Sequence, residues 1–119
     1  MNLVIRANGM QMTEGLRDHT AERARHAFRR LRHRISWVRV QFTDLNGPRG
    51  GVDMRCKIEV MLRSGRSILV KETRETPFSA LADAVDAARH SVARRVARYR
   101  EKRPGRRQVR LNGELVEMA

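Results

Sequence analysis

The feature that most constrains the fold is a run of alternating apolar and polar side chains between residues 52 and 60. A period of two indicates a β-strand with one face buried and the other in solvent. Ser64-Gly65 then predicts a tight turn into a further strand, whose Ile68 and Val70 face inward. Such a sheet needs a second layer to cover its apolar face. The inward positions of the predicted strand are Val52, Met54, Cys56, Ile58, Val60 and Leu62.

Two segments with helical periodicity flank this hairpin and are expected to supply the covering layer. The first begins at Thr13, a predicted N-cap followed by Glu14, and continues to Arg34. The second begins at Thr76-Pro77, with Thr as the cap and Pro at the first helical position, and ends before Pro104-Gly105. Their apolar stripes comprise Leu16, Thr20, Ala24, Ala27, Phe28 and Leu31, and Phe78, Leu81, Ala82, Val85, Ala88, Val92, Val96 and Tyr99.

Two shorter apolar segments, residues 3–5 and 38–42, complete the expected set of strands. The predicted order is β-α-β-β-β-α, an α+β fold with two helices packed on one face of a four-stranded sheet. A chain of 119 residues is the size of one domain, which we place at residues 1–103.

Residues 104–119 are expected to form a C-terminal tail. Within it, Asn112-Gly113 separates two short β-prone segments and predicts a hairpin. An isolated hairpin is marginal in water, so it either docks on the sheet edge or pairs with a second copy as a homodimer. A tail without structure of its own is the alternative.

Charge dominates the composition. The chain carries 26 basic and 13 acidic residues, and its net charge of +13 favours polyanions such as nucleic acid. All the basic residues except Lys57, Lys71 and Lys102 are Arg, whose planar fork pairs with phosphate and stacks on bases.

Both predicted helices begin acidic and end basic, so helices lying side by side would merge their arginine rows into one patch. A merely solvated face is the alternative, but such faces usually mix signs. The predicted contacts are Arg25, Arg29, Arg30, Arg32, His90, Arg94, Arg95, Arg98 and Lys102.

Sites for catalysis, cofactors or metals are not expected. Cys56 lies on an inward strand face and is interpreted as a small buried hydrophobe. His26 and His33 are two turns apart, too far to chelate a metal together. Trp37 points away from Val38 and either packs at the sheet edge or stacks on a base. With one cysteine, no apolar run of 18 residues and no secretory signal pattern, we expect a cytoplasmic protein without a membrane partner.

The second helix carries a resemblance to a known family. Its Phe78-Ser79-Ala80-Leu81 opening, apolar stripe and basic Arg94-Arg95-Val96-Ala97-Arg98-Tyr99 run resemble the bacterial ribosome hibernation-promoting factor family, also called ribosomal subunit interface proteins. The Glu59–Leu62 and Ile68–Val70 strands are similar to the family's central hairpin. The resemblance covers residues 1–103. Phe78 stands where the family usually has Tyr, and Ala82 where it usually has Asp.

The resemblance implies a double-stranded-RNA-binding-like fold that docks on small-subunit rRNA in the mRNA and tRNA channel. Such a protein inhibits translation and protects idle ribosomes, and the basic helix ends would contact the rRNA. The alternatives are a generic dsRNA-binding or RNA-chaperone module, and a ribosome-acting hydrolase or release-type factor. The hydrolase would need a catalytic motif that the sequence does not offer.

Overall fold

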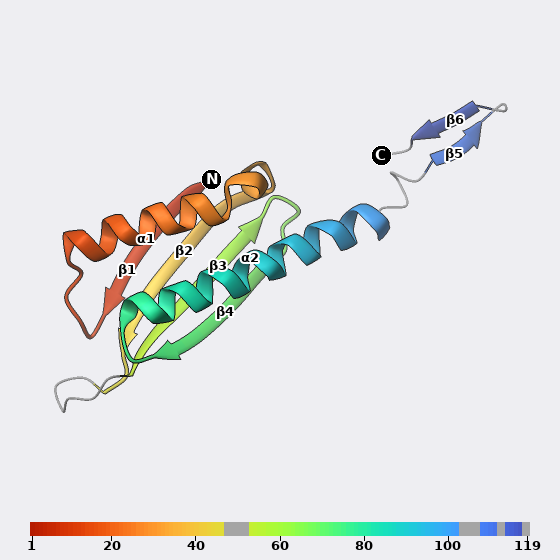
Figure 1. Cartoon of the computed structure of the whole chain (residues 1–119). Coiled ribbons are helices and arrows are strands. Elements are labelled where there is room, and N and C mark those ends of the chain that lie inside the picture. Colours follow the sequence, from red (N-terminus) through yellow and green to blue (C-terminus); the bar gives the residue numbers. More distant parts are fainter. Residues whose placement is uncertain (47–52, 103–107, 112–113, 118–119) are drawn as a thin grey trace.

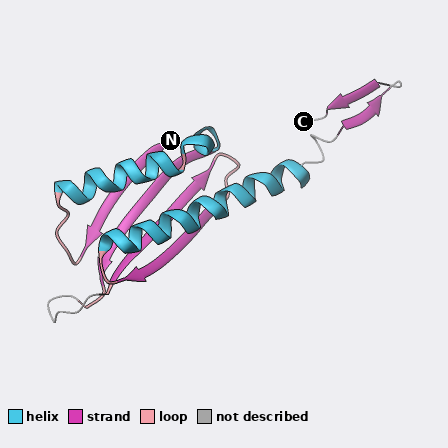
Figure 2. Ribbon diagram, viewed as in Figure 1, coloured by secondary structure: helices cyan, strands magenta, loops and turns pink. Residues whose placement is uncertain are grey.

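The computed structural model describes residues 1–46, 53–102, 108–111 and 114–117. Four strands form one sheet in the order β1-β2-β3-β4: β1 (Asn2–Asn8), β2 (Ile35–Asp44), β3 (Met54–Leu62) and β4 (Ser67–Arg74). Two α-helices, α1 (Glu14–Ala27) and α2 (Pro77–Lys102), cover one face of this sheet (Figures 1 and 2). The predicted α+β fold and its element order are therefore confirmed.

The core lies between the sheet and the helices. β3 alternates as the sequence predicts, with Cys56, Ile58, Val60 and Leu62 all buried. Helix α2 contributes Leu81, Ala84, Val85, Ala88, Val92 and Val96 to the same core. Val52 lies outside the described residues, so its inward position stays a prediction.

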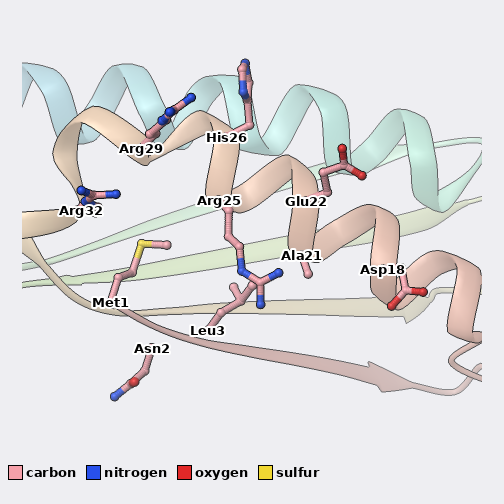
Figure 3. Close-up of a pocket in the computed structure, with 10 residues that line it drawn as sticks. All are labelled: Met1, Asn2, Leu3, Asp18, Ala21, Glu22, Arg25, His26, Arg29 and Arg32. Carbon is pink, nitrogen blue, oxygen red and sulfur yellow. The ribbon is translucent and has the colours of Figure 1, made fainter.

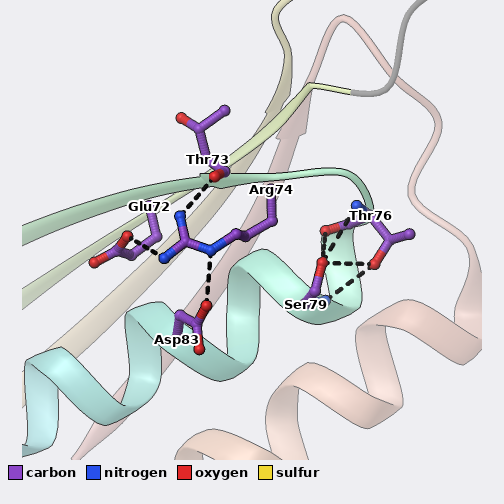
Figure 4. Close-up of polar contacts among 6 residues, drawn as sticks. All are labelled: Glu72, Thr73, Arg74, Thr76, Ser79 and Asp83. Atoms are coloured by element: carbon purple, nitrogen blue, oxygen red, sulfur yellow. Dashed lines mark hydrogen bonds and ion pairs between the residues drawn. The ribbon is translucent and has the colours of Figure 1, made fainter.

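Both helices begin where the sequence predicts. The Leu16 N–H donates to Thr13 Oγ1 at 3.1 Å, which caps α1. At α2, the Ser79 N–H donates to Thr76 Oγ1 at 3.1 Å and the Thr76 N–H donates to Ser79 Oγ at 3.3 Å (Figure 4). This reciprocal pair is a capping box with Ser at the position that Glu usually takes.

The first helix ends earlier than predicted. α1 stops at Ala27, and residues Arg29–Arg34 form a 3₁₀ helix, η1, in which the Leu31 N–H donates to the Phe28 carbonyl at 3.0 Å. The η1 segment offers only Leu31 to the core, so no apolar stripe holds a further α-helical turn against the sheet. The prediction of one helix to Arg34 is wrong in this respect.

Two further differences concern the Phe78 side chain and the register of β2. The prediction that Phe78 belongs to the apolar stripe of the second helix is wrong, because this ring is 48 % exposed. It contacts the His19 ring edge-on, with 5.1 Å between the ring centroids. In β2, Ile35 pairs with Leu62 while Trp37 pairs with Met61, so Ser36 is an extra residue in the strand. This β-bulge lets Ile35 and Val38 both face the core.

The tail contains the predicted hairpin. Strands β5 (Gln108–Leu111) and β6 (Glu114–Glu117) pair antiparallel, with Leu111 opposite Glu114. The predicted Asn112-Gly113 turn lies outside the described residues. In the described part of the chain, β5 and β6 form a sheet of their own and do not extend the four-stranded sheet, so the predicted docking on its edge is not observed.

Candidate nucleic-acid interface

The chain direction places the basic halves of both helices at one end of the sheet. β2 and β4 each run antiparallel to β3, and β1 runs parallel to β2. α1 returns from β1 and α2 returns from β4, so the two helices run the same way (Figure 1). Both helices run toward the end of the sheet that also holds the β3–β4 turn, and α2 continues beyond it (Figure 1). Their carbonyl ends carry the negative ends of the helix dipoles.

The arginines of α1 and η1 line a groove beside β1. Arg25, Arg29 and Arg32 share this groove of about 940 Å³ with Asn2 and Leu3. Figure 3 shows Arg25 extending toward Leu3 of β1. The groove is also lined by Met1, Ala21 and His26, and by the acidic Asp18 and Glu22 nearer the start of α1.

The arginines of α2 line a second, smaller groove of about 270 Å³. Here Arg94, Arg95 and Arg98 lie beside Ile68 and Leu69 of β4. Because β1 and β4 are the two outer strands, the two grooves follow opposite edges of the sheet. We predicted that the two arginine rows merge along adjacent helix faces. The two grooves instead place the rows at opposite edges of the sheet.

The β3–β4 turn supplies cations between the two rows. The Arg63 N–H donates to the Arg34 carbonyl at 2.9 Å, which fastens this turn to the end of η1. The Leu62 N–H donates to the Arg66 carbonyl at 2.8 Å and closes the turn, where Gly65 has a positive φ of 93°. We call the resulting surface the basic end. It comprises Arg29, Arg30, Arg32, Arg34, Arg63, Arg66, Arg94, Arg95 and Arg98.

The basic end keeps its charge unpaired. Within the described residues, the ion pairs join Arg39 to Glu59, Arg74 to Glu72 and Asp83, and Arg89 to Asp86. The Arg74 pairs measure 3.1 and 2.8 Å and lie at the start of α2, away from the basic end (Figure 4). No arginine of the basic end is among these pairs, so its positive charge is available to an external anion.

The other predicted contacts differ in their surroundings. Arg30 and His90 are exposed and line neither groove, and His90 Nε2 lies 3.4 Å from an Arg89 nitrogen. Arg95 is half-buried, whereas Arg94 is exposed and donates to Ser91 Oγ at 3.4 Å. Lys102 lies in the last turn of α2, but its side chain is outside the described part.

Sequence reasoning missed Arg34, Arg63 and Arg66. A signal was available, because two arginines flank the predicted Ser64-Gly65 turn. The position of that turn relative to the helix ends depends on the strand order, which the sequence pattern alone does not give.

Other chemistry is sparse in the described part of the chain. Burial raises the pKa of the Cys56 thiol to about 12, so it stays protonated as predicted for a core residue. No cluster of three or more His, Cys, Asp or Glu side chains suited to a metal ion occurs among the described residues. None of the helices described is both long and apolar enough to cross a membrane.

Comparison with family models decides the family. Residues 3–103 match the model described as sigma 54 modulation protein / S30EA ribosomal protein. The chain belongs to this family. The S30EA match covers every element that builds the two grooves and the basic end, and stops before the β5–β6 hairpin.

Solved structures confirm the fold expected of an S30EA protein. The N-terminal domain of protein Y from Thermus thermophilus is similar with a TM-score of 0.66 and 21 % identity, over 79 % of this chain and 98 % of that one. A ribosomal subunit interface protein from Coxiella burnetii gives a TM-score of 0.61 and 19 % identity, over 86 % of this chain and 100 % of that one. Among curated proteins, no sequence matches this chain.

Proposed function

We propose that this S30EA-family protein binds small-subunit rRNA in the mRNA and tRNA channel, and thereby inhibits translation and promotes ribosome hibernation under stress. Two observations support the proposal. The family is one of ribosome-associated proteins, and the basic end gathers unpaired arginines on η1, the β3–β4 turn and α2.

The unpaired charge of the basic end is the observation that carries the proposal. Each phosphate that an arginine neutralises releases condensed counterions, which favours binding and makes it salt-dependent. The arginines come from three different elements and flank two grooves, so they suit a folded RNA surface better than an isolated phosphate. Recognition of this kind reads the shape of the backbone and needs few base-specific contacts.

The test is sedimentation of the purified protein with 30S subunits over a salt series, with tRNA as a competitor. We expect binding that falls with salt and with added tRNA. Reversal of two exposed charges in R94E/R98E should abolish binding. The matched control R17E/R23E reverses two exposed arginines on α1 that lie outside the basic end, and it should still bind.

Three outcomes would contradict the proposal. If the R94E/R98E variant still binds 30S subunits, the binding site on this protein is not where we propose it. If tRNA does not compete, the protein does not bind in the mRNA and tRNA channel of the subunit. Equal affinity for unrelated double-stranded RNA would favour the alternative, a generic dsRNA-binding or RNA-chaperone module.

We further propose that the protein acts in the cytoplasm by binding and not by catalysis. The buried, protonated Cys56 thiol supports the second point, because it is no nucleophile. Turnover of peptidyl-tRNA by the purified protein would refute it.

The β5–β6 hairpin is the segment that we propose for pairing with a second copy. Its strands are separate from the four-stranded sheet, which leaves their outer edges to another partner. Sizing of the full chain beside residues 1–103 tests this idea, and an identical oligomeric state for both would discard it.

A further inference from the structure

The sheet has a second face, which in the described part of the chain no helix covers (Figures 1 and 2). Strand pairing places its side chains in cross-strand rows. One row runs Asn2, Trp37, Met61 and Ser67, and the next runs Val4, Arg39, Glu59 and Leu69. The third runs Arg6, Gln41, Lys57 and Lys71, and the fourth runs Asn8, Thr43, Arg55 and Thr73.

The first two rows of this open face contain four apolar side chains. Trp37 lies directly opposite Met61, and Val4 and Leu69 occupy the two ends of the neighbouring row. Leu69 is 55 % exposed. We call Val4, Trp37, Met61 and Leu69 the sheet shelf. Trp37 and Met61 are direct neighbours on it, whereas Arg39 and Glu59 lie between Val4 and Leu69.

The Trp37 ring on this shelf is held in position. The Arg39 guanidinium lies 4.8 Å from the centre of the Trp37 ring, a cation–π contact. The same guanidinium donates to Glu59 Oε1 at 3.2 Å, and that bond fixes Arg39 across β2 and β3. Arg39 covers one face of the ring, so only the opposite face is left for a ligand to stack on. A ring that is already oriented loses little conformational entropy in such stacking.

Cations border the shelf on both sides along the strands. Toward the middle of the sheet lies the row with Arg6, Lys57 and Lys71, followed by Arg55. Toward the other side, Arg63 of the basic end follows the end of β3, two residues after Met61. Glu59 is the one acid in the four rows, and it is already paired with Arg39.

We propose that this open face binds an unpaired RNA strand, with one base stacked on Trp37 and the flanking phosphates on Lys57, Lys71 and Arg63. Aromatic rings beside cationic tracks are the usual means of holding single strands, because every base has a π-face. The charge of the face favours RNA over a protein partner. The inference adds a second RNA surface to the proposed function, and this surface shares only Arg63 with the basic end.

Trp37 is itself the reporter for the test, since the chain contains one tryptophan. We expect its emission to be quenched when the full-length protein is titrated with a short oligoadenylate. In an anisotropy assay with the labelled oligonucleotide, W37L should bind about 5- to 150-fold more weakly, which is the range of one lost base stack. W37F keeps a ring and should retain most of the affinity.

Further variants separate this surface from the basic end. K57Q/K71Q should weaken oligoadenylate binding and reduce its salt dependence, whereas R94E/R98E should still show the quenching of Trp37. Melting temperatures of all variants identify any change that is merely a loss of folding.

Three results would overturn the proposal. The first is unchanged Trp37 emission at saturating oligoadenylate, and the second is wild-type affinity in a folded W37L variant. The third is emission that responds to 30S subunits but not to oligoadenylate, since another ribosomal component would then occupy the shelf. Loss of 30S binding alone would contradict the proposed function and leave the quenching by oligoadenylate intact.

Discussion

Neutralising Arg94 and Arg98 is expected to reduce the salt dependence of 30S binding by a calculable amount. Each phosphate contact contributes about 0.7 to 0.9 to the slope of log Kobs against log salt concentration. The R94Q/R98Q variant removes two contacts, so the magnitude of the slope should fall by about 1.4 to 1.8. The measurement is the 30S dissociation constant over a series of salt concentrations.

The same substitutions should leave the fold intact. Arg94 and Arg98 are exposed, and neither is among the ion pairs of the described residues. The hydrogen bond from Arg94 to Ser91 Oγ is long, at 3.4 Å. The free energy of unfolding should therefore change by no more than about 0.5 kcal/mol. A loss of affinity in this variant then reports on the interface and not on stability.

The R17Q/R23Q variant is the matched control, because it removes the same charge from exposed positions outside the basic end. Its slope should stay close to that of the unmodified protein. An equal reduction in both variants would mean that net charge, and not the basic end, determines binding. An unchanged slope in R94Q/R98Q would show that α2 makes no phosphate contact, and would refute the reasoning.

Three further predictions concern the buried core. F28A should lower the free energy of unfolding by about 3 to 5 kcal/mol because Phe28 is fully buried, whereas F78A at a half-exposed ring should cost much less; denaturant titration measures both. The Cys56 thiol should resist alkylation in the folded protein and react once it is unfolded. Burial raises its pKa from 9.0 to about 12, so the folded state keeps a proton that the unfolded state loses. Stability should therefore fall as pH rises above about 9, and a flat profile there would contradict this.

The fold was largely predictable from the sequence because each element carries its own local signal. The alternation from Cys56 to Leu62 matches the burial of β3, and the Thr13 and Thr76 caps lie where the helices begin. These patterns depend only on the period of the backbone and on local hydrogen bonds. Tertiary packing does not have to be known to interpret them.

The differences arise where packing competes with local preference. Arginine is a good helix former, so helix propensity alone does not predict that α1 gives way to a 3₁₀ helix at residues 29–34. The β-bulge at Ser36 likewise follows from pairing with β3, because Ile35 and Val38 must both reach the core. Phe78 fits the helical stripe by periodicity, yet the sheet does not cover its position at the start of α2.

The candidate site shows the same division. The sequence of each helix shows that its first half is acidic and its second half basic. Whether the two basic halves lie at the same end of the sheet depends on the direction in which each helix runs. In the observed order, the ends of α1 and α2 and the β3–β4 turn all lie at one end of the sheet, since each strand or helix reverses the direction of the one before it. The basic residues near the helix ends and beside Gly65 therefore lie at the same end of the sheet, however each helix is rotated about its own axis. Arg63 and Arg66 follow from this topology, and their contribution requires no contact between the helix faces.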